Sequence, residues 1–242
     1  MELTDRGVPP CNTPMLLVLA AALVLSASDG SGSESQTSAL RTFYLTDPRS
    51  GPCALWTAME QWARQARVRV GFEAALQCSP GRKVLEAGYE AVVFERTTPT
   101  RALELLLQLA PDFTWRNVGG IVVVRPKQAW TDPGSPLKQP LQPFQVTGAH
   151  PQIAVHEALE AAQPPLLMPQ TALDGPTIGR QIRDRIAVQF DGGTLLDALN
   201  AIIWEFEGMW QIGYTGKAFH VVLHTFDFEE DGGIITGRLP GR

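Results

Sequence analysis

The apolar and polar positions of two stretches of the chain follow the same pattern. Residues 94–107 read FERTTPTRALELLL, and residues 190–203 read FDGGTLLDALNAII. In both, an alternating strand is followed by a threonine and then by apolar residues at helical spacing. Thr98 and Thr194 are of the type that caps a helix N-terminus, and Pro99 fits the first helical position. The pattern predicts a strand followed by a capped helix, present twice.

The residues around the first stretch predict the element order β-α-β-β-α-β-β. Strands are predicted at 42–45, 68–72 and 89–95, followed by two strands around the tight turn Gly119-Gly120. Helices are predicted over 54–65 and 99–110. The apolar positions expected to face the core are Leu55, Met59, Trp62 and Ala66 on the first helix and Leu103, Leu106, Leu107 and Ala110 on the second.

The second half of the chain predicts the same order, although its middle strand at 166–168 matches the first half less well. Its strands are expected at 143–147, 166–168 and 185–190, its helices at 153–162 and after Thr194, and its closing hairpin within 209–226. Thr194 with Asp197 has the spacing of a capping box. Gly208 is placed to end the second helix in a left-handed conformation.

These elements divide the chain into six segments of an α+β protein. They are a signal peptide (1–28), a disordered linker (29–41), a first module (42–127), a Pro-rich linker (128–142), a divergent second module (143–228) and a flexible tail (229–242). The Pro-rich stretch PKQAWTDPGSPLKQPLQP is unsuited to a continuous helix or sheet. We therefore expect two tandem small β-α-β-β-α-β-β modules joined by this linker.

The N-terminus predicts export. Residues 15–28 read MLLVLAAALVLSAS, an apolar run that is too short to span a membrane comfortably and that ends in a small-residue cleavage pattern. A periplasmic or secreted protein without a membrane span after signal removal is expected. The preceding residues contain Glu2 and Asp5 against Arg6, which is unusual for a signal peptide. The alternative is therefore an uncleaved N-terminal anchor.

Composition narrows the classes of partner. The 242-residue chain has a formal net charge of -5 and 44% hydrophobic residues, so it can bury a core. Its pI of about 5.4 argues against nucleic acid as a partner. Outside the leader the cysteines are Cys53 and Cys78, which the predicted helix and returning strand bring to the same end of the first module. We expect a disulfide between them, and the alternative is two buried free thiols.

Two segments of the first half resemble a known family. They read ALWTAMEQWARQARVRVGF and EAVVFERTTPTRALELLLQLAPDFTWRNVGGIVVVRP. With the helix core Ala102-Leu103-x-x-Leu106-Leu107 and the closing Ile121-Val122-Val123-Val124, they are similar to the secretin and TonB short N-terminal (STN) domain. FDGGTLLDALNAI in the second half is similar to the same family. The resemblance implies a free-standing tandem pair that binds an envelope protein, as an accessory to a secretin or a TonB-dependent outer-membrane system.

Catalytic and metal-binding patterns are not recognised in the sequence. Common nucleophile, zinc-protease and phosphate-loop motifs are not found, so neither enzymatic activity nor a cofactor is expected. His220 and His224 would lie about 13 Å apart on one strand, too far to share an ion, and we expect both to face solvent. The acidic run at 227–231 lacks the spacing of a calcium loop. No metal site is predicted, and an enzyme without a recognisable motif is the least favoured alternative.

Two tryptophans are candidate partner contacts. Trp56 and Trp204 lie off the apolar stripes of their predicted helices, and an exposed tryptophan is a common anchor in protein interfaces. The alternative is that they pack on the linker or on the other module. A second function considered is binding of a small ligand or glycan in a cleft between the modules, lined by Trp130 or Trp210. Open sheet edges offer a further docking mode by strand addition.

Overall fold

The computed structural model describes residues 40–51, 53–74, 90–166, 185–206, 208–215 and 218–226. Over these residues the fold is mixed α+β, with four helices and several small sheets, which confirms the predicted class. The predicted signal peptide, the segment 29–39, the tail after 226 and Cys78 lie outside the described residues.

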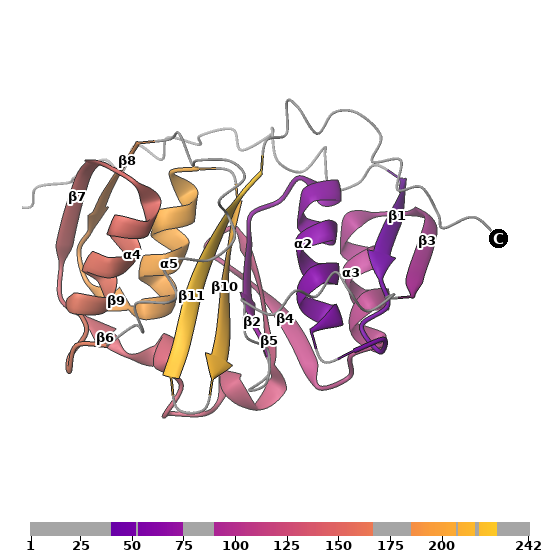
Figure 1. Ribbon diagram of the computed structural model, residues 1–242, viewed down its shortest axis with the longest axis horizontal. Coiled ribbons are helices and arrows are strands. Elements are labelled where there is room, and N and C mark those ends of the chain that lie inside the picture. Colours follow the sequence, from indigo (N-terminus) through magenta and orange to yellow (C-terminus); the bar gives the residue numbers. More distant parts are fainter. Residues whose placement is uncertain are drawn as a thin grey trace, which may run out of the picture.

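The described elements follow each other in the order shown in Figure 1. The strands are β1 (Arg41–Thr46), β2 (Val70–Glu73), β3 (Ala91–Thr97), β4 (Phe113–Val118), β5 (Ile121–Pro126), β6 (Pro140–Leu141), β7 (Phe144–Ala149), β8 (Ile186–Phe190), β9 (Gly193–Thr194), β10 (Gly208–Thr215) and β11 (Ala218–Thr225). The helices are α2 (Ala54–Ala66), α3 (Pro99–Gln108), α4 (Pro151–Glu160) and α5 (Leu195–Trp204), with 3-10 turns η2 (Lys127–Trp130) and η3 (Pro136–Lys138).

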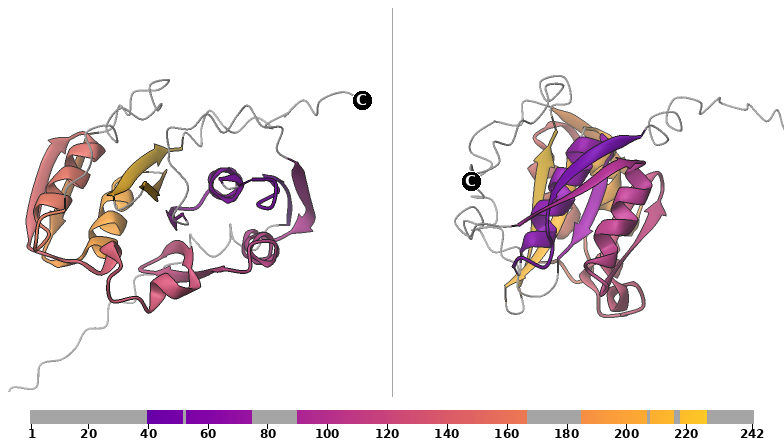
Figure 2. Two further views of the ribbon diagram at one scale, coloured as in Figure 1. Left: turned by 60° about the horizontal axis from the view of Figure 1, so that its bottom comes forward. Right: turned by 90° about the vertical axis from the view of Figure 1, so that its right-hand side faces the viewer.

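The elements form layers around a central sheet (Figures 1 and 2). A five-stranded sheet in the order β11-β10-β2-β5-β4 lies in the middle. On one side α2 and α3 separate it from the two-stranded sheet β1-β3, and on the other side α4 and α5 separate it from β7-β8. The molecule therefore places a two-stranded sheet at each end.

The central sheet joins the two halves of the chain. β2 comes from the first half, yet β10 of the second half pairs with it in parallel, with Met209 opposite Val70 and Ile212 opposite Glu73. On its other side β2 pairs in parallel with β5. The two halves therefore share one sheet, because the short strand β2 pairs with the closing hairpin of each half.

The helix starts predicted at Thr98 and Thr194 are confirmed. The Thr98 side chain accepts a hydrogen bond from the Arg101 N–H, and Pro99 is the first residue of α3. Thr194 and Asp197 form the capping box at the start of α5. The prediction for Gly208 is wrong: α5 ends at Trp204, and Gly208 begins β10. A side chain there would come within 2.1 Å of the His224 carbonyl oxygen, so close strand packing explains this glycine.

Both faces of the central sheet are buried, one by each half. Along β10, Met209 faces the core of the first half, whereas Trp210 and Ile212 face the core of the second. β5 likewise alternates, with Val123 facing the second half and Val124 the first. Parallel strands are commonly buried on both faces, and here each face is covered by a different pair of helices.

Trp210 crosses β2 at its one glycine. The indole is fully buried, and a Cβ at Gly71 would lie 2.1 Å from its ring. Its Nε1 donates to Asn200 Oδ1 of α5 at 2.9 Å, and the Asn200 amide reaches the Val118 carbonyl at 3.5 Å. Gly71 and Trp210 thus fit together only because position 71 has no side chain.

A buried polar network closes the same face of the sheet. Glu73 accepts hydrogen bonds from Arg125 Nε at 2.5 Å and from the Tyr214 hydroxyl at 2.6 Å. Arg125 also donates to Ser135 in the Pro-rich segment at 2.6 Å, and its guanidinium lies 4.9 Å from the centre of the Trp130 ring. Burial, with the Glu73 charge, raises the pKa of Tyr214. The network joins strands of both halves to the segment between them.

Candidate functional site

Trp204 is an exposed aromatic residue in a fixed position. It is the last residue of α5, and 47% of it is exposed. Arg69 of the first half donates to the carbonyls of Ile203 at 2.9 Å and Phe206 at 3.1 Å, and its guanidinium lies 4.7 Å from the centre of the Trp204 ring. The indole thus packs partly on the other half, as the alternative foresaw, and still presents about half of its surface to solvent.

Trp56, the other predicted contact, is less available. It is half-buried, with its ring 6.0 Å from that of Phe72 in an edge-to-face arrangement. Its carbonyl accepts a hydrogen bond of 3.4 Å from the Gln211 side chain on β10. The helix face that it shares with Ala63 is covered by the hairpin of the second half. The periodicity of a single helix could not predict that this hairpin packs on it.

Sequence reasoning missed an apolar pair on the outer face of β1-β3. Tyr44 is 59% exposed and Val93, its cross-strand partner, is 44% exposed. The signal was present in the alternation of β1, where Tyr44 lies between the core residues Phe43 and Leu45. A residue between two core positions of a strand faces outward, and here it is large and apolar.

The outer sheet of the second half differs at the matching positions. In β7-β8, Gln145 lies between the core-side residues Phe144 and Val146 and pairs with Gln189. Both glutamines are exposed. The same place in the two end sheets thus carries an apolar pair in the first half and an amide pair in the second.

Side chains fill the junction of the two halves around Trp130 and Trp210, where a ligand-binding cleft was considered. Trp210 is fully buried, and Trp130 is half-buried with Arg116 4.4 Å from its ring centre. A shallow hollow of about 420 Å³ lies elsewhere, at the end of α4 and the start of β7. Its lining includes Phe144, Glu157 and Glu160. This hollow involves neither tryptophan of the predicted cleft.

The expectation that both histidines of β11 face solvent is wrong. His220 is 8% exposed, and the His224 side chain is 16% exposed. By alternation they share one face of β11, and His224 Nδ1 on that face is 3.7 Å from Glu60 Oε1 of α2. Val221 and Leu223 face the core of the second half, and the opposite face of β11 is also largely buried, so alternation does not separate core from solvent here. Within the described ranges no three potential metal ligands gather.

Acidification is expected to destabilise the protein through His224. Burial lowers the pKa of His224 below its ordinary 6.5, and the charge of Arg64 acts in the same direction while Glu60 opposes it. The unfolded chain then binds a proton that the folded chain does not, so the free energy of unfolding falls as the pH drops below about 6.5. Urea unfolding across a pH series should show a smaller fall for His224→Phe than for the parent. Equal slopes would contradict this reading. His150, whose pKa burial also lowers, supplies a residual slope in both.

Cys53 is buried just before α2, at 8% exposure. Cys78 lies outside the described residues, so the Cys53–Cys78 disulfide stays a prediction.

Comparisons with known proteins give no match: no family model, no curated protein and no solved structure matches the chain. None of the helices in the described part of the chain is long and apolar enough to cross a membrane.

Proposed function

We propose that the two halves are divergent copies of one STN-like unit. What supports this is their shared order of elements: an outer strand, a helix, the second outer strand, a capped helix and a closing hairpin. The threonine caps Thr98 and Thr194 fall at matching places of the repeated sequence pattern. In each half the two helices lie between a two-stranded sheet and the central sheet. We propose that the protein is an exported pair of such units, directed to the periplasm by its signal peptide.

We further propose that this protein binds another envelope protein, a component of a secretin or TonB-dependent outer-membrane system, and catalyses no reaction. The observation that carries the proposal is the exposure of Trp204. A tryptophan that is held in place with 47% of its surface exposed is a common kind of anchor in protein interfaces.

The surroundings of Trp204 favour binding because they hold the ring in place. The Arg69 guanidinium packs against the indole ring of Trp204. The Gly119-Gly120 turn also lies close to this ring, since a Cβ at Gly120 would be 3.0 Å from Trp204 Cζ2. A side chain that is already ordered loses little conformational entropy when a partner covers it. The turn and Arg69 come from the first half and Trp204 comes from the second. The surface around Trp204 therefore forms only where the two halves meet.

Replacing the indole should remove the partner without unfolding the protein. The mature chain from Asp29 and its Trp204→Ala variant would each be immobilised and incubated with envelope extract, and retained proteins identified by mass spectrometry. Loss of an interface tryptophan typically costs about 2 kcal/mol or more, which is roughly a thirty-fold loss of affinity. We expect the parent to retain an outer-membrane channel or receptor component and the variant to lose it.

Gln108→Ala is the matched control. Gln108 is exposed at the end of α3, the place that corresponds to Trp204 in the first half. Near-UV circular dichroism would first establish that all three proteins are folded. If Trp204→Ala retains the same proteins as the parent, or if the parent retains none, the proposal fails.

A further inference from the structure

Only one edge of the outer sheet β1-β3 remains open among the described residues. The N–H of Tyr44 donates to Gln65 Oε1 at 3.0 Å, and its carbonyl accepts from Gln65 Nε2 at 2.8 Å. The N–H of Thr46 donates to Gln61 Oε1 at 2.7 Å. Two glutamines of α2 thus take the place of a neighbouring strand along β1. The free edge of this sheet is that of β3.

The same bonds show which groups of β3 point outward. Because Tyr44 directs its N–H and C=O to Gln65, Tyr44 and Val93 form a pair that is not hydrogen-bonded between the strands. The N–H and C=O of Val93 therefore point away from β1, and those of Ala91 do so by alternation. Thr97 is opposite Arg41 after a shift in register, so the regular part of the edge ends near Glu95.

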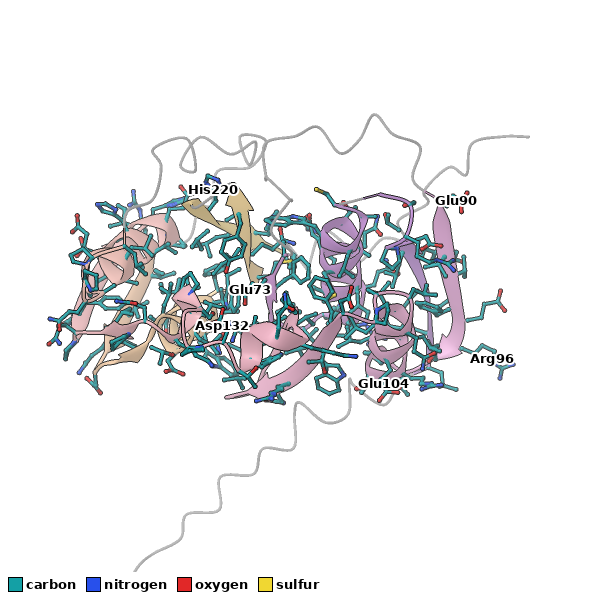
Figure 3. All side chains as sticks on the ribbon, turned by 90° about the horizontal axis from the view of Figure 1, so that it is seen from below. Glu73, Glu90, Arg96, Glu104, Asp132 and His220 are labelled. Atoms are coloured by element: carbon teal, nitrogen blue, oxygen red, sulfur yellow. The ribbon has the colours of Figure 1, made fainter. Side chains whose placement is uncertain are left out.

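This edge is self-complementary in charge. Glu90 and Arg96 are both exposed and lie three residues before and three residues after Val93. Figure 3 shows them at the two ends of the outermost strand, with Arg96 pointing away from the body of the molecule. A two-fold axis through Val93 would bring Glu90 of each copy beside Arg96 of the other.

We propose that a second copy of this chain occupies the β3 edge, by antiparallel pairing of β3 with β3 about a two-fold axis at Val93. The pairing forms a four-stranded sheet across the dimer and places the two Tyr44–Val93 pairs side by side on one face. It goes beyond the partner binding proposed for Trp204, because it uses a different surface and requires no other protein.

Other registers of the same edge fit less well. An axis at Glu95 would place two glutamates directly opposite each other, and like charges in that position destabilise a sheet. An axis at Ala91 would put Glu90 opposite Val92, so the pairing of Glu90 with Arg96 would be lost. With the axis at Val93, Glu95 faces Ala91 and every charge at the edge meets a neutral or opposite group.

The interface is small, so the dimer should be concentration-dependent. One strand edge with its flanking side chains buries less than about 1,200 Å² in total, the range of weak and transient complexes. The matching place in the second half, with Gln145 and Gln189 in place of Tyr44 and Val93, offers a weaker apolar contact. Association through the first half alone gives a closed dimer rather than a chain of molecules.

Sedimentation velocity over a wide concentration range tests the proposal. We expect the mature chain to shift from monomer to dimer as concentration rises. Glu90→Arg and Arg96→Glu should each weaken the dimer at least ten-fold, and the double variant should restore it, because exchanging both charges rebuilds the pair. A parent that stays monomeric up to near-millimolar concentration, or a dimer that neither single reversal weakens, overturns the proposal.

Cross-linking locates the axis. Paired residues that exchange hydrogen bonds in an antiparallel sheet have Cα atoms about 5.5 Å apart, within the range of a disulfide. Val93→Cys should therefore form a disulfide-linked dimer on oxidation, whereas Gln189→Cys, at the matching place of the second half, should not. Equal cross-linking of both variants would contradict the proposed axis.

Trp204→Ala should leave the dimer intact, which separates this proposal from the one for the envelope partner. If the chain is monomeric and the double variant Tyr44→Gln, Val93→Gln loses an envelope protein, the face belongs to that protein and not to a second copy.

Discussion

Gly71→Ala is expected to destabilise the protein by about 3 kcal/mol or more, because the new methyl group has no room. Its Cβ would lie 2.1 Å from the Trp210 ring, and Trp210 is fully buried with its Nε1 bonded to Asn200. Either the indole moves and leaves Asn200 without its donor, or β2 moves and loses its pairing with β10. Urea unfolding followed by circular dichroism would measure the loss of free energy.

Two further variants make this result specific. Gly134→Ala changes an exposed glycine whose added Cβ would approach only the Asp132 side chain, at 3.3 Å, so its effect should stay within about 0.5 kcal/mol. In the background of Trp210→Leu, Gly71→Ala should cost much less than in the parent, since the contact that it violates is gone. A cost of Gly71→Ala that is the same in both backgrounds would show that the indole is not the obstacle.

Arg125→Met should cost about 3–5 kcal/mol, because it leaves the Glu73 carboxylate buried without its cation. Arg125 is 1% exposed and Glu73 is 3% exposed, so water cannot replace the guanidinium without opening the structure. Tyr214 would remain as a single donor to Glu73. The stabilities would be compared by urea unfolding at neutral pH.

Replacing the whole network should recover most of that loss. In the triple variant Glu73→Leu, Arg125→Met, Tyr214→Phe no buried charge is left unpaired, and apolar side chains of similar volume often replace buried ion pairs at little cost. A triple variant that is less stable than Arg125→Met alone would mean that the network contributes more than the avoidance of an unpaired charge.

Periodicity and capping chemistry predicted most of the elements. The stripe Leu55, Met59, Trp62 and Ala66 is buried in α2, and the strand-to-helix passages at Thr98 and Thr194 are confirmed. These features depend on residues close in the sequence, so a single sequence is enough to read them. The closing hairpin around Gly119-Gly120 is confirmed for the same reason, with both glycines at positive φ.

The pairing of β2 with β10 could not be predicted in this way. Val70–Glu73 has the pattern of an ordinary short strand, and its residues do not indicate which other strands it will pair with. The hairpin of the second half therefore appeared to have a solvent face, and the sequence placed His220 and His224 there. Once β10 joins β2, that face turns toward the first half, where His224 lies beside Glu60 and Gln211 bonds to the Trp56 carbonyl.

The candidate surfaces were only partly predictable. Trp204 was found because its neighbours on α5 form a clear apolar stripe that excludes it. Its contact with Arg69 depends on the junction of the halves and has no local signal. The outward position of Tyr44 follows from the alternation of β1, but its pairing with Val93 required the strand register.

Hydrogen exchange tests most directly whether β2 makes the two halves one unit. Exchange of the amides of α3 and α5 would be followed by mass spectrometry in the parent and in Gly71→Ala. The shared sheet predicts that protection of both helices falls together and by the same free energy, because loss of β2 exposes the cores of both halves. A fall confined to the first half, with α5 and the β10-β11 hairpin protected as in the parent, would contradict the account.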